Sequence, residues 1–120
     1  MHLKNFNWPT EFDSPDSPGS GANMQQSTLV KLQKAREIAR FPFKINSAYR
    51  TPEHNRKVGG TPDSAHTRGH AVDIKARTGM AKFKILQAVI KAGFNRIGIY
   101  RTFVHVDDDP TMPQDVIWLG

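Results

Sequence analysis

Apolar positions along the chain follow two periods, and the longer one marks two helices. A repeat of three and four residues predicts one helix over residues 27–40, which Pro42 ends, and another over residues 80–92, which Gly93 ends. The residues expected to face the core are Leu29, Leu32, Ala35 and Ala39 in the first helix and Phe83, Leu86, Val89 and Ile90 in the second.

The shorter period, in which apolar and polar residues alternate, marks the strands. The strands predicted in this way cover residues 43–49, 71–75, 96–100, 103–107 and, as a last edge strand, 116–119. Only Arg101 and Thr102 separate the third strand from the fourth, which is the length of a hairpin turn. Short links of this kind favour antiparallel neighbours.

Two polar segments follow neither period. Residues 1–23 are rich in Pro, Asp, Ser and Gly, and we expect an irregular arm that Trp8 and Phe12 anchor to the core. Residues 50–68 are expected to form a long loop with one helical turn near Pro52. A loop of this length in a compact domain is usually functional.

Together these elements predict a single α+β domain over residues 1–120, with about four antiparallel strands and helices packed on one face. No apolar run approaches the roughly 18 residues of a membrane span. The first residues also lack an apolar stretch of signal-peptide length, so export by that route is not expected.

The amino-acid composition limits the classes of partner that the chain favours and the residue types that could bind a metal ion. The 17 basic and 11 acidic residues give a net charge of +6, which favours anionic partners such as nucleic acid, anionic lipid or cell-wall polymer. Lys and Arg are scattered rather than clustered, so nucleic acid is not the partner we expect. We also expect the protein to be a monomer. Without cysteine, a metal site would have to use His, Asp or Glu.

Candidate chemistry gathers where histidines and aspartates meet short strands. Gly69 lets the chain turn between His66 and Asp73, so His66 can fold back over the strand that carries Asp73. On the later strand, His105 and Asp107 share one face. A half-buried pair of this kind needs a partner, and a metal ion is one candidate. Two histidines and one aspartate would leave a fourth zinc position open, as in catalytic sites.

Other polar residues near these positions have simpler interpretations. A single histidine is more often a surface or hydrogen-bonded core residue, and His2 and His54 are assigned to that group. His70 follows His66 by four residues, but Gly69 argues against a helix there, so His70 is not an expected ligand. The Asp108-Asp109 pair before a proline is expected to form a solvated acidic turn.

Four segments together resemble the zinc D-Ala-D-Ala carboxypeptidase family, a peptidoglycan-cleaving group related to lysostaphin and to the hedgehog signalling domain. These segments are Ser47–Asn55, Val58–Gly60, Ser64–Ile74 and Phe103–Asp107. The pattern S-x-H-x-x-G-x-A-x-D, followed by H-x-D on a predicted strand, is specific. The resemblance covers residues 12–119 and is strongest for small members encoded by bacteriophages.

The resemblance implies the fold of that family and a Zn²⁺ ion held by His66, Asp73 and His105. It implies that Arg50 binds a substrate carboxylate or carbonyl, which a planar guanidinium suits. It also implies that Ser64 hydrogen-bonds substrate or a ligand residue. A structural salt bridge for Arg50 and a turn or cap for Ser64 are the alternatives.

One position departs from the family pattern. Better-known members carry an acidic general base three residues before the last histidine ligand, where this chain has Thr102, which cannot take a proton from water. Asp107 is the best replacement, either as the base or as the residue that orients His105.

The function implied is zinc-dependent hydrolysis of an amide bond in peptidoglycan peptides, as a carboxypeptidase or an endopeptidase. We expect a bacteriophage endolysin-like enzyme that is made in the host cytoplasm and acts at the cell wall. Thr102 leaves one alternative open, which is a zinc-binding module without catalysis.

Overall fold

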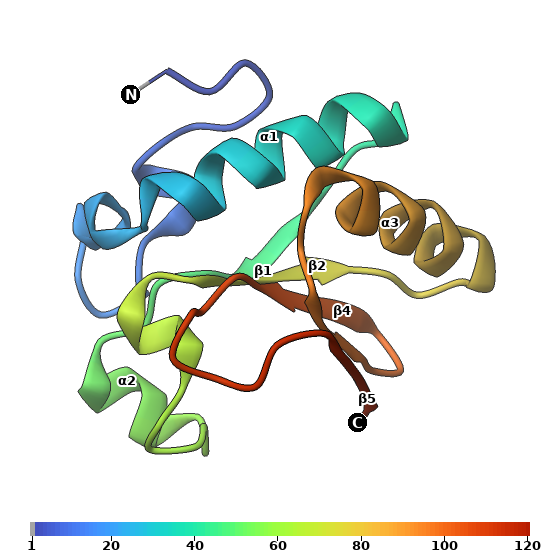
Figure 1. Cartoon of the computed structure of the whole chain (residues 1–120). Helices are drawn as coiled ribbons and strands as arrows, with labels where there is room; N and C mark the ends of the chain where they lie inside the picture. The colour runs from blue at the N-terminus through green and yellow to red at the C-terminus, as the bar shows by residue number, and fades with distance from the viewer. Residues whose placement is uncertain (1) are drawn as a thin grey trace.

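Residues 2–120 form a mixed α+β fold in the computed structural model (Figure 1). The α-helices are α1 (Gln26–Ala39), α2 (Pro52–Lys57) and α3 (Gly79–Ala92), and the 3₁₀ helices are η1 (Thr10–Phe12), η2 (Ser20–Asn23) and η3 (Ala65–Arg68). The two long helices lie within one residue of their predicted bounds. None of the helices in residues 2–120 is long and apolar enough to cross a membrane.

The sheet has five strands in the order β1-β2-β4-β3-β5. These strands are β1 (Ile45–Ser47), β2 (Ala71–Lys75), β3 (Arg96–Ile99), β4 (Phe103–Asp107) and β5 (Val116–Leu119). The predicted edge strand is confirmed, but it runs parallel to β3, so the sheet is mixed rather than antiparallel throughout. The reason is that β4 ends beside Arg96, the first residue of β3, and residues 108–115 carry the chain across this N-terminal end of β3 before β5 begins beside the same residue.

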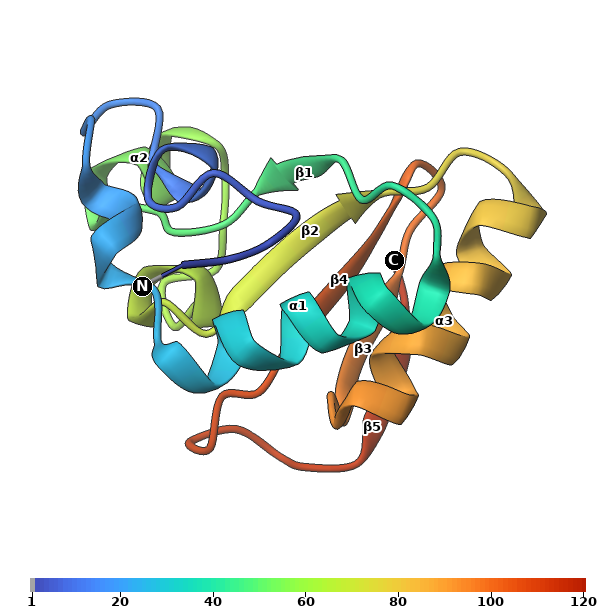
Figure 2. The ribbon, with the colours of Figure 1, turned by 90° about the horizontal axis from the view of Figure 1, so that it is seen from above.

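Helices α1 and α3 cover one face of the sheet, as Figure 2 shows from above. Strand alternation turns every second residue of β2 and β4 toward these helices, and these four apolar side chains have no exposed surface. The residues buried in this way are Val72, Ile74, Val104 and Val106. The two long helices therefore pack on one face as predicted, whereas the loops and the short helices α2 and η3 lie on the side of the opposite face (Figure 1).

Two residues of α3 point away from the core, contrary to the sequence prediction. Phe83 and Ile90 are 65% and 53% exposed. The buried stripe consists instead of Ile85, Ala88, Val89 and Ala92. The helix carries two overlapping apolar stripes, and packing against α1 and the sheet selects the one with the smaller residues.

The two segments without periodicity are more ordered than the sequence predicts. The arm holds η1 and η2, and Phe12 is fully buried and accepts a backbone hydrogen bond from Tyr49. The segment over residues 50–68 holds α2 and η3 rather than one turn. Thr51 caps α2 by accepting a hydrogen bond from the backbone N–H of His54, and proline at the first helical position preorganises the helix.

Candidate active site

The face of the sheet opposite the helices carries one aligned residue from each strand. Ser47 pairs with Asp73, and Asp73 pairs with His105. His105 then pairs with Gly98, and Gly98 with Trp118. Adjacent strands lie roughly 4.8 Å apart, so neighbours in this row are in side-chain reach. The row therefore places Asp73 and His105 side by side near the middle of the sheet.

His66 reaches the row from η3, which precedes β2. Ser64 caps η3 by accepting a hydrogen bond from the backbone N–H of His66 at 3.2 Å. Gly69 ends η3 with a left-handed φ of 75°, and a Cβ there would lie 2.2 Å from the carbonyl oxygen of Asn23. The predicted turn at Gly69 is confirmed, and it folds His66 back onto β2.

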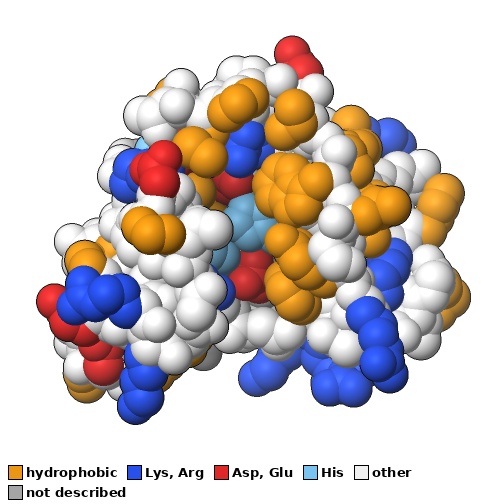
Figure 3. Space-filling view, turned by 90° about the horizontal axis from the view of Figure 1, so that it is seen from below, with side chains coloured by type: hydrophobic (Ala, Val, Ile, Leu, Met, Phe, Trp, Pro, Cys, Tyr) orange, Lys and Arg blue, Asp and Glu red, His pale blue; other side chains and the backbone are white. Residues whose placement is uncertain are grey.

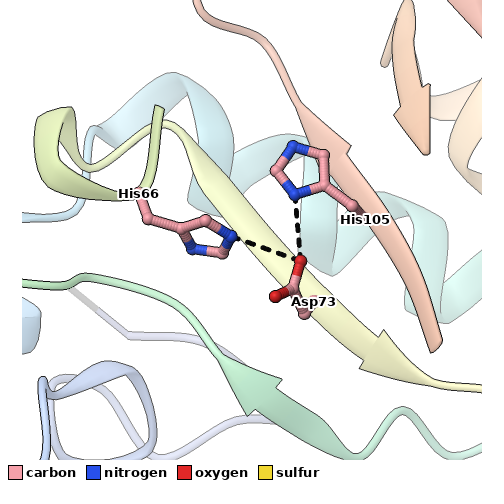
Figure 4. Close-up of side chains that lie close together, drawn as sticks. All are labelled: His66, Asp73 and His105. Carbon is pink, nitrogen blue, oxygen red and sulfur yellow. Dashed lines mark hydrogen bonds and ion pairs between the residues drawn. The ribbon is translucent and has the colours of Figure 1, made fainter. Parts of the chain in front are cut away.

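His66, Asp73 and His105 converge on one point (Figure 4). Nε2 of His66 lies 3.2 Å from Oδ1 of Asp73, and Nδ1 of His105 lies 2.9 Å from the same oxygen. The three candidate ligand atoms are all within 4.8 Å of one another. The three residues come from η3, β2 and β4, and the structure brings them together as the sequence predicted.

The outer nitrogen of each histidine ring faces a hydrogen-bond acceptor outside the cluster. Nδ1 of His66 lies 2.7 Å from the carbonyl oxygen of Ala48, which can only accept. Nε2 of His105 lies 2.7 Å from Oδ2 of Asp107. A neutral imidazole has one N–H, so a ring that donates from its outer nitrogen directs the lone pair of its inner nitrogen toward the Asp73 oxygen. Three converging lone pairs require a cation or additional protons, and two histidines with one carboxylate form a donor set that suits Zn²⁺.

The charge states of Asp73 and His105 depend on each other. Burial opposes ionisation of Asp73, but hydrogen bonds from His105 and His66 outweigh it and hold the pKa of Asp73 well below its ordinary value. Burial likewise opposes protonation of His105, but hydrogen bonds to Asp107 and Asp73 raise the pKa of His105 to about 9. Without a metal, a proton on His105 is thus the cation that this cluster favours.

Asp107 is enclosed by hydrogen-bond donors. Its Oδ1 accepts from Nε of Arg96 at 2.7 Å and from the backbone N–H of Asp109 at 3.2 Å, while Oδ2 faces His105. The Asp107 side chain is 1% exposed. Sequence reasoning missed Arg96, although the alternation over 96–100 places it on the same face as Gly98.

Arg50 contacts the cluster at Asp73, whereas Asp107 contacts it at His105. Its Nη2 is 3.5 Å from Oδ2 of Asp73, its Nε donates to Ser47, and its Nη1 donates to Asn55 at 3.2 Å. The ion pair to Asp73 and the position of Arg50 at the cleft fit both roles given to it by the sequence. Asn55, which is buried and also donates to the carbonyl oxygen of Thr61, was not singled out.

The cluster lies at the bottom of an open cleft of about 570 Å³. Figure 3 shows the histidines and aspartates in this hollow, with hydrophobic side chains along one side. Arg50, Thr61 and Ser64 line one part of the cleft, and Tyr100, Phe103 and Trp118 are among the residues that line another.

Asp108 and Asp109 do not form the solvated turn that the sequence predicted. The Asp108 side chain is 4% exposed and pairs with Lys31 at 3.1 Å and with His70 at 3.0 Å. Asp109 is fully buried and pairs with Arg68 at 2.6 Å. The prediction was wrong because cationic side chains of α1 and η3 reach these carboxylates from distant parts of the chain.

The remaining histidines lie outside the cluster, as predicted. His70 binds Asp108 rather than pointing toward Asp73, His54 is on α2, and His2 is exposed in the arm.

Two histidines with one carboxylate, at the bottom of an open cleft, are typical of zinc hydrolases. The family model of Peptidase M15 matches residues 1–107. The chain therefore belongs to the Peptidase M15 family of metallopeptidases, which confirms its resemblance to the zinc D-Ala-D-Ala carboxypeptidases. No curated protein matches the chain.

Proposed function

We propose that the protein is a zinc-dependent peptidase that hydrolyses an amide bond in the peptides of bacterial peptidoglycan, as a bacteriophage cell-wall-degrading enzyme. We also propose that the chain has the fold shared by the D-Ala-D-Ala peptidases and the hedgehog domain. One observation carries the proposed function: one possible ligand atom from each of His66, Asp73 and His105 converges at the bottom of a cleft in a chain of the Peptidase M15 family. The net charge of +6 suits an anionic wall.

The zinc ligands in this proposal are Nε2 of His66, a carboxylate oxygen of Asp73 and Nδ1 of His105. Bound zinc would supply Lewis-acid activation of water and of the scissile carbonyl. The carbonyl of Ala48 and the carboxylate of Asp107 fix the tautomers of the two histidines, so that each ring directs a lone pair inward.

Arg50 is the proposed anchor for a substrate carboxylate or carbonyl oxygen. Its guanidinium is held by Ser47 and Asn55 and lines the cleft close to Asp73, so it is oriented before substrate arrives. Ser64 lines the same cleft. Its hydroxyl accepts a hydrogen bond from the backbone N–H of His66, and the hydroxyl hydrogen can donate to substrate.

Asp107 is proposed to orient His105 rather than to take a proton from water. Three internal donors occupy its two oxygens, and its side chain is almost fully buried, which leaves little room for a water molecule to approach it. Its negative charge also favours the ring of His105 as a metal ligand, because a carboxylate partner raises imidazole basicity.

The decisive experiment is mass spectrometry of peptidoglycan fragments after incubation with the purified, zinc-loaded protein. We expect new stem-peptide fragments from the parent and from His54→Ala, a matched histidine variant outside the cluster. We expect no fragments from His66→Ala. Products shortened by a C-terminal residue would indicate a carboxypeptidase, and internal cleavage an endopeptidase. Turnover by His66→Ala at the parent rate would rule out the site.

A second candidate function rests on Thr102, which lies in the β3–β4 turn where relatives carry an acidic residue. A zinc-binding module without catalysis would bind one zinc per chain and leave every fragment intact. Measuring the zinc content of the same sample therefore distinguishes a chain that binds zinc without catalysis from one that does not bind zinc.

A further inference from the structure

Three aromatic side chains form a continuous surface at the edge of the cleft. Tyr100 follows β3 and Phe103 begins β4, and their rings stack with centroids 4.4 Å apart and planes 8° apart. Trp118 of β5 donates a hydrogen bond from Nε1 to the Tyr100 hydroxyl at 3.0 Å. All three are half-buried and line the cleft that holds the histidines. We call these residues the aromatic wall.

Gly98 makes room for this wall. A Cβ on Gly98 would lie 2.5 Å from Nε1 of Trp118, so only glycine lets the indole lie across β3. The indole then reaches His105, with ring centroids 5.4 Å apart. The Arg96 guanidinium lies 5.3 Å from the indole centroid and holds it by a cation–π contact. The indole is thus fixed in place beside a proposed zinc ligand.

The row across the sheet gives the cleft two different sides. Arg50 contacts Asp73 on the side of β1, whereas Trp118 contacts His105 on the side of β5. A substrate amide above Asp73 and His105 would therefore have a guanidinium on one side and aromatic rings on the other. Aromatic faces favour C–H groups, and burying an unpaired carboxylate against them is costly.

We propose that the aromatic wall is a specificity-determining subsite that binds the C–H face of an uncharged substrate group. This group, an aliphatic side chain or a sugar ring, would lie on the side of the scissile amide opposite the group that Arg50 binds. The inference rests on the proposed peptidase function and adds the substrate chemistry that each side of the cleft selects.

The kinetic test compares Phe103→Ala and Trp118→Leu with Phe83→Ala, a matched variant of an exposed phenylalanine on α3. The substrates are disaccharide-bearing muropeptides and the same peptides without sugars. Loss of an aromatic anchor is expected to raise KM about tenfold, with zinc affinity unchanged, while Phe83→Ala behaves as the parent. A rise confined to the disaccharide substrates assigns a sugar, and an equal rise in both assigns an aliphatic side chain. A KM within twofold of the parent in both wall variants would overturn the proposal.

A binding test separates this inference from the proposed hydrolysis. The chain has two tryptophans, so Trp8→Phe leaves Trp118 as the only fluorophore of its kind. We expect its emission to change when the disaccharide muropeptide is added to the zinc-loaded variant. A change in emission without cleavage would support binding at the aromatic wall and contradict the proposed peptidase activity. No change in emission at saturating muropeptide would contradict binding at the aromatic wall.

Discussion

The position of one hydrogen on His105 decides whether its ring can bind a metal ion. Nδ1 faces Asp73 and Nε2 faces Asp107, so a hydrogen on Nε2 leaves Nδ1 free as a ligand. A metal ion at Nδ1 would replace the hydrogen that faces Asp73, and the Asp107 carboxylate would then accept the hydrogen on Nε2. Arg96 holds the carboxylate from behind at 2.7 Å, so its influence reaches the metal site through Asp107 and His105.

Asp107→Asn tests this arrangement directly. An amide has one oxygen for the three donors around it, so its NH₂ group must face either His105 or Arg96. We expect the histidine tautomer to change and zinc affinity to fall roughly 10- to 100-fold, as for other outer partners of metal ligands. Titration against a fluorescent chelator measures the affinity, with Asp115→Asn, an exposed aspartate, as the control. Unchanged zinc affinity with lost turnover would instead make Asp107 the proton acceptor.

Sequence reasoning reached His66, Asp73 and His105 because each lies within a local pattern of a few residues. It missed Arg96 and Asn55, since the contact of Arg96 depends on strand register and that of Asn55 on how helix α2 packs against Arg50. The acidic pair after β4 was misjudged for the same reason, because its cationic partners lie on α1 and η3.

At the scale of elements, Asp108 ties the end of β4 to α1. It accepts hydrogen bonds from Thr28 and Lys31 and contacts His70 before β2. Burial acts to raise its pKa, but the hydrogen bonds from Thr28 and His70 outweigh burial and lower the pKa of Asp108 below its ordinary value. The ionised form therefore stabilises the folded state.

Asp108→Asn is expected to lower the free energy of unfolding by about 1–3 kcal/mol at pH 7. A carboxyl with a lowered folded pKa contributes stability that is present above its unfolded pKa and lost as pH falls through the folded pKa. The penalty should therefore shrink as the pH falls below 3.8. Urea unfolding of parent and variant at pH 7 and pH 3 measures it, and an equal penalty at both pH values would contradict this role.

Gly98 positions β5 relative to the metal cluster, and Gly98→Ala tests that contact. The new methyl group would overlap the indole of Trp118, and overpacking of this kind typically costs about 1–3 kcal/mol. We expect a lower unfolding midpoint and altered Trp118 fluorescence in the Trp8→Phe background. Gly79→Ala is the matched control, because a Cβ there meets nothing within 4 Å. Equal stability of the two variants would contradict the contact.

Most helices and strands can be predicted from the sequence because each spans enough residues for the spacing of its apolar positions to be recognised. The direction of β5 and the buried face of α3 cannot, since both depend on where the chain goes after β4 and on which neighbours α3 meets. Helix α2 was underestimated because five of its six residues are polar and leave no apolar period, and its cap at Thr51 is the signal that identifies it.

At the scale of the whole molecule, a metal ion would connect η3, β2 and β4. Zinc at roughly 1,000 times its Kd should raise the free energy of unfolding by about 4 kcal/mol, since it binds the folded state preferentially. Thermal unfolding with zinc and with a chelator measures this effect. His66→Ala should show no comparable response, and a parent whose midpoint is the same in both conditions would contradict zinc binding at this site.

The alternation of side chains along β2 and β4 ties the metal cluster to the hydrophobic core. Asp73 and His105 point to one side while their immediate neighbours fill the other, so a shift by one residue would exchange ligands for core residues. Insertions or deletions of one residue within these two strands should therefore abolish folding and function together. Residues 110–115, which are mostly exposed and follow the buried Asp109, lie outside both strands, so variation in chain length during evolution should be concentrated there rather than in the strands.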